Sequence, residues 1–217
     1  MTVGLQRHEI WVDLGLSGLT KWFGGPWNPG ATTSGMIAEI ADWGEGGFAP
    51  LLLEDALRVL NSPIPTRTAD TVLCAALGRA YGPDFGGSGL LRQIVGACVE
   101  RVRRDDPSYE PVPPGPSPYL GLAGEVLAEI DEAGPTLSLS VAGAPGRDVP
   151  GLVPALEQFV TEVDPDLGFR LFLRAMKMYA VPITAEQYTN YLALGQKFGY
   201  HEEVVDDGNL QIPDSLD

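Results

Sequence analysis

Hydrophobic periodicity is clearest in the last third of the chain, where apolar side chains recur at spacings of three and four residues. Such spacing gathers them on one face of an α-helix. We therefore predict three consecutive helices, over residues 152–163, 165–179 and 184–198. Asp164 is placed to cap the second helix, and Pro165 suits its first position, where a missing N–H is no loss. Thr184 and Gln187 form a capping box at the start of the third helix.

The second of these helices carries three cations, Arg170, Arg174 and Lys177, at a spacing that places them along one side. Its last turn is therefore basic, which suits the negative end of the helix dipole. Because the links between the three helices are short, we expect them to pack as antiparallel neighbours. They would then form the core of the C-terminal half.

Helical patterns with terminators at their ends fill much of the remaining chain. They predict helices over residues 34–43, 50–60, 68–81, 88–104 and 119–133. Two segments instead alternate with the two-residue period of a strand, residues 2–14 and residues 136–141. We expect these segments to pair, joined by Leu210 and Ile212 from the tail. The predicted fold is mainly α, a bundle-like array of about eight helices with at most one small sheet of two or three strands.

Residues 17–33 hold Trp22 and Trp27 among glycines and prolines that interrupt regular structure. Such a loop either packs onto the core through its own side chains or presents its aromatic surface to a partner. Packing is the favoured interpretation, because exposed tryptophan is costly. If the loop is a contact surface, Trp22 and Trp27 are the candidate anchors.

A proline-rich stretch at residues 107–118 is the best candidate for a boundary. It predicts a stiff, extended connector between an N-terminal helical lobe, residues 1–106, and an acidic helical lobe, residues 119–217. A ligand for an aromatic-lined groove is the alternative interpretation of this stretch. Strand pairing between the lobes would make them pack as one unit.

Composition indicates a globular protein, since 44% of the 217 residues are hydrophobic. No apolar run approaches the ~18 residues of a membrane span, and the N-terminus lacks a charged start followed by an apolar stretch. We therefore expect a cytoplasmic protein with neither secretion signal nor anchor. Cys74 and Cys98 lie among Ala, Leu and Val in helical patterns, and we expect them to be small core residues.

The formal net charge is −15, and it is unevenly distributed. Residues 1–104 carry 10 acidic and 9 basic side chains, whereas residues 105–217 carry 19 acidic and 5 basic ones. A field of this sign repels phosphates and anionic lipid headgroups, so we expect neither nucleic acid nor membrane as a partner. It attracts a basic protein and speeds the encounter. Solubility alone is the simpler explanation of the charge.

Motifs for common chemistries are absent from the sequence, which has no nucleophile elbow, no phosphate-binding loop and no dinucleotide fingerprint after a predicted strand. The two histidines, His8 and His201, lie near opposite ends of the chain. A zinc site would need both of them to converge with both cysteines. We therefore expect no metal and no other cofactor.

One polar cluster follows the last predicted helix. It comprises Glu202, Glu203, Asp206 and Asp207. The ligand spacing and central glycine of an EF-hand are missing from it. A solvated acidic tail is the first interpretation, a patch that binds a basic protein is the second, and a site for a hard cation is the third.

Two classes of function fit these observations. The first is a non-catalytic interaction protein that binds and neutralises a basic partner. This broad description resembles the toxin-neutralising immunity proteins of bacteria, which are compact, acidic and free of catalytic motifs, although no motif carries particular residues over. The second class is an enzyme that uses scattered carboxylates, such as Glu39, Asp42, Glu54 or Asp55, in a cleft. A structural subunit of a larger assembly is a third alternative.

Overall fold

The structure is a computed structural model that describes residues 7–23, 32–79 and 86–212. Ten α-helices form within these ranges, with short 3-10 turns at Arg7–Glu9, Trp43–Gly46 and Leu120–Leu122. The helices are α1 (Gly15–Phe23), α2 (Thr33–Asp42), α3 (Phe48–Asn61), α4 (Thr66–Leu77), α5 (Gly87–Asp105), α6 (Ala123–Ala142), α7 (Leu152–Glu162), α8 (Pro165–Met178), α9 (Ala185–Lys197) and α10 (Glu202–Val205). The prediction of a mainly α fold is confirmed.

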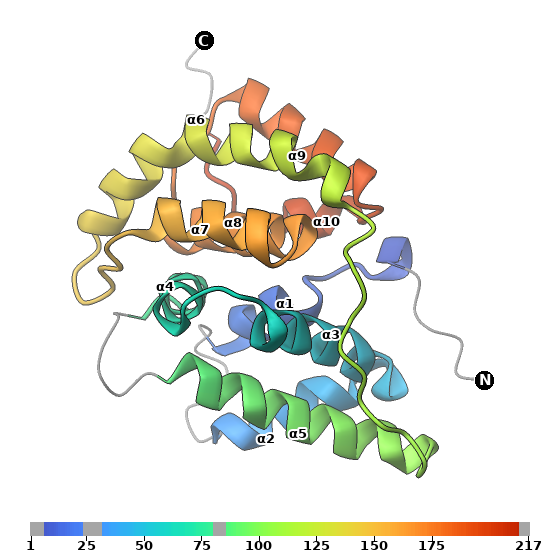
Figure 1. Ribbon diagram of the computed structural model, residues 1–217. Coiled ribbons are helices and arrows are strands. Elements are labelled where there is room, and N and C mark those ends of the chain that lie inside the picture. Colours follow the sequence, from blue (N-terminus) through green and yellow to red (C-terminus); the bar gives the residue numbers. More distant parts are fainter. Residues whose placement is uncertain (1–6, 24–31, 80–85, 213–217) are drawn as a thin grey trace.

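The helices lie in stacked layers, with the N-terminal half below and the C-terminal half above in the view of Figure 1. Helices α6 and α9 form the uppermost layer, and α7 and α8 lie beneath them. The next layer holds α4, α1 and α3, and α2 and α5 close the opposite side. The two halves meet where α4 packs on α7 and α8 and where α1 packs on α8. Their buried apolar residues form one continuous cluster.

Helix α8 lies at the centre of this stack and is buried along its length, from Pro165 to Lys177. Its predicted cap is confirmed, since the side chain of Asp164 accepts a hydrogen bond from the Leu167 N–H at 3.0 Å. The predicted capping box of Thr184 and Gln187 is present at the start of α9. Because α8 is covered on all sides, its three cations, Arg170, Arg174 and Lys177, are buried as well.

The strand predicted over residues 136–141 is wrong, because helix α6 continues through it and past Pro135. Leu137 and Val141 are buried and lie four residues apart, whereas Leu139 between them is 76% exposed. They extend a helical stripe of buried residues that starts earlier in α6, at Val126, Ile130 and Ala133. Gly134 and Pro135 therefore interrupt the pattern without ending the helix.

The other strand predictions are also wrong within the described residues, and residues 2–6 of the segment predicted over residues 2–14 lie outside them. Residues 10–14 are irregular and lead into α1. In the tail, Gln211 makes one isolated parallel bridge with Pro182, and the described residues contain no strand. Ile10, Leu14 and Leu210 of these segments are buried without a sheet, whereas Ile212 is 41% exposed.

Helix α1 replaces the first part of the predicted loop at residues 17–33. The glycines of α1 do not end the helix, because they allow a close backbone contact and a positive φ at its start. A Cβ at Gly18 would lie 2.3 Å from the carbonyl oxygen of Asp13, and Gly15 has a φ of +57°, which favours glycine. Leu16 and Leu19 of this helix are buried in the core.

The contact between α7 and α8 gives the first prediction, at Gly168. A Cβ there would lie 2.6 Å from Val160 Cγ2 and 3.2 Å from Val160 Cα. We expect Gly168→Ala to lower the free energy of unfolding by about 1–3 kcal/mol, since overpacking outweighs the gain in helix propensity. Gly96 in α5 is the control, because nothing lies within 4 Å of its added Cβ and an exposed helical Gly→Ala change stabilises by about 0.5–1 kcal/mol. Urea unfolding compares the two variants, and equal effects would contradict the close packing.

Candidate functional site

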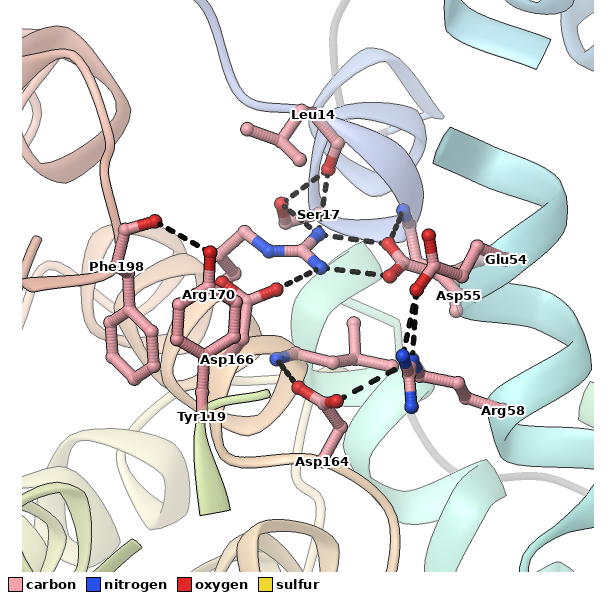
Figure 2. Close-up of polar contacts among 12 residues, drawn as sticks. Leu14, Ser17, Glu54, Asp55, Arg58, Tyr119, Asp164, Asp166, Arg170 and Phe198 are labelled. Atoms are coloured by element: carbon pink, nitrogen blue, oxygen red, sulfur yellow. Dashed lines mark hydrogen bonds and ion pairs between the residues drawn. The ribbon is translucent and has the colours of Figure 1, made fainter. Parts of the chain in front are cut away.

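Figure 2 shows the guanidinium of Arg170 at the junction of α1, α3 and α8. Its Nη1 and Nη2 atoms each donate to one carboxylate oxygen of Asp55 at 2.8 Å, and Nη2 also donates to Asp166 Oδ2 at 3.0 Å. Nη1 donates to the carbonyl oxygen of Leu14 at 2.9 Å. Burial alone would lower the pKa of Arg170, but the carboxylates of Asp55 and Asp166 outweigh it and raise that pKa. The guanidinium stays charged and is fully enclosed.

Asp55 also accepts a hydrogen bond from the backbone N–H of Leu16 at 2.9 Å, so this carboxylate fixes the start of α1 as well as Arg170. Asp166, on the other side, accepts a hydrogen bond from the hydroxyl of Tyr200. The side chains of the pair are almost inaccessible, at 0% exposure for Arg170 and 7% for Asp55. This network therefore holds the two halves together and presents no open face to a ligand.

A second arginine, Arg58, holds the proline-rich connector, and Figure 2 shows its contacts with Glu54 and Asp164. Arg58 donates from Nη2 to Glu54 at 2.7 Å and from Nη1 to the carbonyl oxygen of Gly115 at 3.0 Å. Its Nε lies 3.4 Å from Asp164 Oδ2. Burial raises the pKa of Asp164, although the hydrogen bond from Leu167 opposes the shift. The connector is thereby held against α3 and the start of α8.

The stripe of cations on α8 continues to Lys177, which holds the segment after α10. Lys177 Nζ lies 3.2 Å from Asp207 Oδ1 and donates to the carbonyl oxygen of Val204 at 3.2 Å. Asp207 also pairs with Lys21 of α1. Burial would raise the pKa of Asp207, but the two lysines lower it well below its usual range. The C-terminal segment is therefore attached to both α1 and α8.

Arg174 lies between these two networks and faces Asp13. Both are buried, with 8% and 5% of their surfaces exposed. Burial lowers the pKa of Arg174 and raises the pKa of Asp13, although the charges around each group oppose these shifts. Arg174 Nε and Asp13 Oδ2 make no hydrogen bond to another described residue. These two groups therefore carry an electrostatic cost that their neighbours only partly offset.

Burial of this stripe determines the charge of the surface above it. Of the five cations in residues 105–217, Arg170, Arg174 and Lys177 are buried. The remaining two are Arg147 and Lys197, and Lys197 pairs with Glu125 of α6. The outer surface of α6, α9 and α10 therefore exposes carboxylates with few cations between them.

The acidic residues of this surface influence one another. Exposed carboxylates on these three helices are Glu125, Asp131, Glu132, Glu186, Glu202 and Glu203. Half-buried Glu129 lies among them, and burial raises its pKa, with Glu132 and Glu186 adding to the shift. We call Glu129, Glu132, Glu186, Glu202 and Glu203 the acidic surface. Repulsion of the Glu129 carboxylate by Glu132 and Glu186 carries a cost in stability.

The predicted acidic cluster divides into two kinds of residue. Glu202 and Glu203 are exposed in α10 and belong to the acidic surface. Asp206 instead accepts hydrogen bonds from the N–H groups of Gly208 and Leu210, and Asp207 is held by its two lysines. These two carboxylates organise the chain internally, so the interpretation of residues 201–207 as a freely solvated tail does not describe them. A role of all four residues in partner binding stays a prediction.

The two candidate aromatic anchors fall on different parts of the chain. Trp22 is half-buried at the end of α1 and packs edge-on against Trp43, with ring centroids 4.9 Å apart. Trp27 lies outside the described residues. Trp22 thus packs on the core, and its role as a partner anchor stays a prediction.

The structure brings together the two histidines that the sequence places near opposite ends. His8 and His201 line the same pocket of about 290 Å³, next to α9 and α10. Trp11 stacks on His201, with ring centroids 4.9 Å apart and planes 10° apart. No local signal in the sequence indicates this meeting, because it depends on how the two ends of the chain fold back.

Three of the four carboxylates proposed for an enzyme are engaged in separate ion pairs, and the fourth, Glu39, is exposed on α2. Asp42 pairs with Arg101, Glu54 with Arg58 and Asp55 with Arg170, which gives three different ion pairs. Within the described ranges, no group of three or more His, Cys, Asp or Glu side chains is arranged to hold a metal ion. In the same ranges, no helix has both the length and the apolar character to span a membrane.

Both cysteines are free and buried, as predicted. Burial raises the pKa of the Cys74 thiol to about 11 and that of Cys98 to about 12. Neither is therefore a reactive thiolate near neutral pH.

Comparison with protein-family models, with curated proteins and with solved structures found no match. The functional proposal therefore rests on the residues described above.

Removal of Arg170 tests the central ion pair. Arg170→Met leaves the carboxylates of Asp55 and Asp166 buried without their cation, so we expect a loss of about 3–5 kcal/mol in the free energy of unfolding. Arg104→Met is the control, because Arg104 is exposed and its ion pairs are 3.8 and 3.9 Å long. It should change stability by less than about 1 kcal/mol. Urea unfolding measures both, and similar losses would contradict the central role of Arg170.

Asp207 and Asp13 give opposite dependences of stability on pH. The pKa of Asp207 is lowered in the folded state, so its contribution to stability is present above the unfolded pKa of about 3.9 and is lost below it. The cost of Asp207→Asn should therefore be larger at pH 7 than at pH 3. The pKa of Asp13 is raised, so its contribution is full below about 3.9 and is lost as pH rises through the folded pKa.

Asp13→Asn should accordingly be more favourable at pH 7 than at pH 3, relative to the unchanged protein. Urea unfolding of the three proteins at both pH values measures the two trends. Trends of the same sign for the two variants would show that the pKa shifts are assigned to the wrong groups.

Proposed function

We propose that this protein is a non-catalytic interaction protein that binds a basic protein partner through its acidic surface. The partner class that we favour is a bacterial toxin domain with a cationic substrate site. By covering that site, the protein would act as an inhibitor, in the manner of an immunity protein.

The observation that carries this proposal is the burial of the cations of α8. Arg170, Arg174 and Lys177 are exposed by 1%, 8% and 7%. These cations are therefore not at the surface, where they would neutralise the exposed carboxylates of the outer helices. The exposed face of α6, α9 and α10 is therefore more acidic than the sequence suggests. A concentrated field of one sign is the feature that steers an oppositely charged protein.

A stability cost at this surface supports binding over solubility alone. Glu129 has one carboxylate oxygen buried without a hydrogen bond, and its pKa is raised by burial and by Glu132 and Glu186. Solubility requires charges to be exposed, but it does not require them to be crowded and partly buried. A basic partner would remove this repulsion on binding, so the crowding favours the complex.

The proposal predicts how the association rate depends on charge. The experiment is a pull-down from native cells, followed by binding kinetics of the captured basic protein over a salt series. We expect Glu132→Gln, Glu186→Gln and Glu203→Gln together to lower the association rate constant about tenfold at low salt, and the dissociation rate constant much less. The effect should shrink as salt rises, because the Debye length falls to about 8 Å at physiological ionic strength.

The matched control removes the same number of charges from the opposite end of the molecule. It combines Glu39→Gln, Glu45→Gln and Glu100→Gln, all exposed residues of the N-terminal half. This control should lower the association rate much less. An association rate that ignores salt, or that responds equally to the two triple variants, would leave the acidic surface as a solubility feature.

A further inference from the structure

The pocket beside α9 and α10 combines aromatic, amide and acidic groups. Its volume is about 290 Å³, and its polar lining consists of His8, Gln196, Tyr200, His201 and Glu202. Ligand pockets for whole small molecules span roughly 300–1,000 Å³, so this one is at their lower limit. It is better matched to one side chain of a protein partner than to a cofactor.

An exposed tryptophan stands next to this pocket. Trp11 is 63% exposed, yet its ring is held parallel to that of His201 by the stacking contact. An exposed tryptophan that is already held in one orientation loses little conformational freedom when a partner binds. Tryptophan is also among the residues that most often dominate binding energy at protein interfaces.

The charge around the pocket favours a cation. Glu202 lines it, and exposed Glu203 follows directly in α10. Lys197 follows the lining residue Gln196 in the sequence of α9, but its ammonium group pairs with Glu125 of α6. A cation that enters therefore meets a carboxylate and the faces of aromatic rings, which attract it through their quadrupoles.

We propose that this pocket binds an arginine side chain of the basic partner, with the guanidinium against His201 and Trp11 and paired with Glu202. Arginine fits better than lysine, because its planar group stacks on rings and donates several hydrogen bonds at once. The amide oxygen of Gln196 is a second acceptor in the lining. This inference rests on the proposed function, since it names the contact that the basic partner makes beside the acidic surface.

Three short peptides test the pocket without the natural partner. They are acetyl-Gly-Arg-Gly-amide, its lysine counterpart and its citrulline counterpart, which keeps the shape of arginine without the charge. The readout is the NMR signal of the Trp11 indole N–H, identified by its loss in Trp11→Phe. We expect a saturable shift with the arginine peptide, binding at least fivefold weaker with lysine, and no saturation with citrulline. Absence of saturation with arginine, or equal binding of citrulline, overturns the proposal.

Two neighbouring carboxylates provide the matched variants. Glu202→Gln removes the charge that lines the pocket, whereas Glu203→Gln removes a neighbouring exposed charge that does not line it. We expect Glu202→Gln to weaken the arginine peptide at least fivefold and Glu203→Gln less than twofold. Equal effects of the two variants overturn the assignment of Glu202. Both variants keep the His201 side chain as the cap of α10, and urea unfolding checks that each is folded.

The two proposals fail in different ways. Trp11→Ala should raise the dissociation rate of the captured partner at least tenfold and leave the salt dependence of its association unchanged. If the arginine peptide binds but the partner's association ignores the acidic surface, the pocket stands and the steering surface falls. If association responds to the acidic surface but the peptides do not bind, the pocket falls and the steering surface stands.

Discussion

The guanidinium of Arg170 is the contact on which the arrangement of the two halves depends. It joins α8 to Asp55 of α3 and to the carbonyl oxygen of Leu14 before α1, and Asp55 in turn holds the N–H of Leu16. Each partner is buried, so any arrangement that separates them leaves a charge or a polar group without compensation. A well-packed apolar core in this place would tolerate sliding between helices. The bidentate pair adds a directional requirement to the contact between α3 and α8, which an apolar contact lacks.

The same central helix determines the outside of the molecule. Because α8 is covered on all sides, its cations are used against Asp55, Asp166 and Asp207 in the interior. These cations are therefore absent from the outer layer, where they would have neutralised exposed carboxylates. The uneven charge of the sequence becomes a sharper asymmetry in the folded protein. Internal packing and the surface field are thus two consequences of one buried stripe.

Local signals in the sequence were sufficient for most helices, because a cap and an apolar stripe lie within a few residues of each other. Asp164 and the capping box of Thr184 are examples. Predictions failed where the deciding contact is distant. In the sequence, Gly18 indicates a break in the helix, but in the structure it allows the close approach of the Asp13 carbonyl oxygen. Pro135 likewise indicates a helix end, but the buried stripe of α6 continues past it to Val141. The burial of the cations and the meeting of the two histidines likewise depend on tertiary contacts that no local pattern contains.

The buried network and the surface pocket are mechanically connected through the C-terminal segment. Asp207 lies two residues after the end of α10 and is held by Lys21 of α1 and Lys177 of α8. Lys177 also holds the carbonyl oxygen of Val204 within α10 itself. The position of α10 fixes where Glu202 lines the pocket. Lys177 does not line the pocket, so it acts on the position of α10 from the interior. The pocket that we propose for a partner is therefore connected to the core through α10.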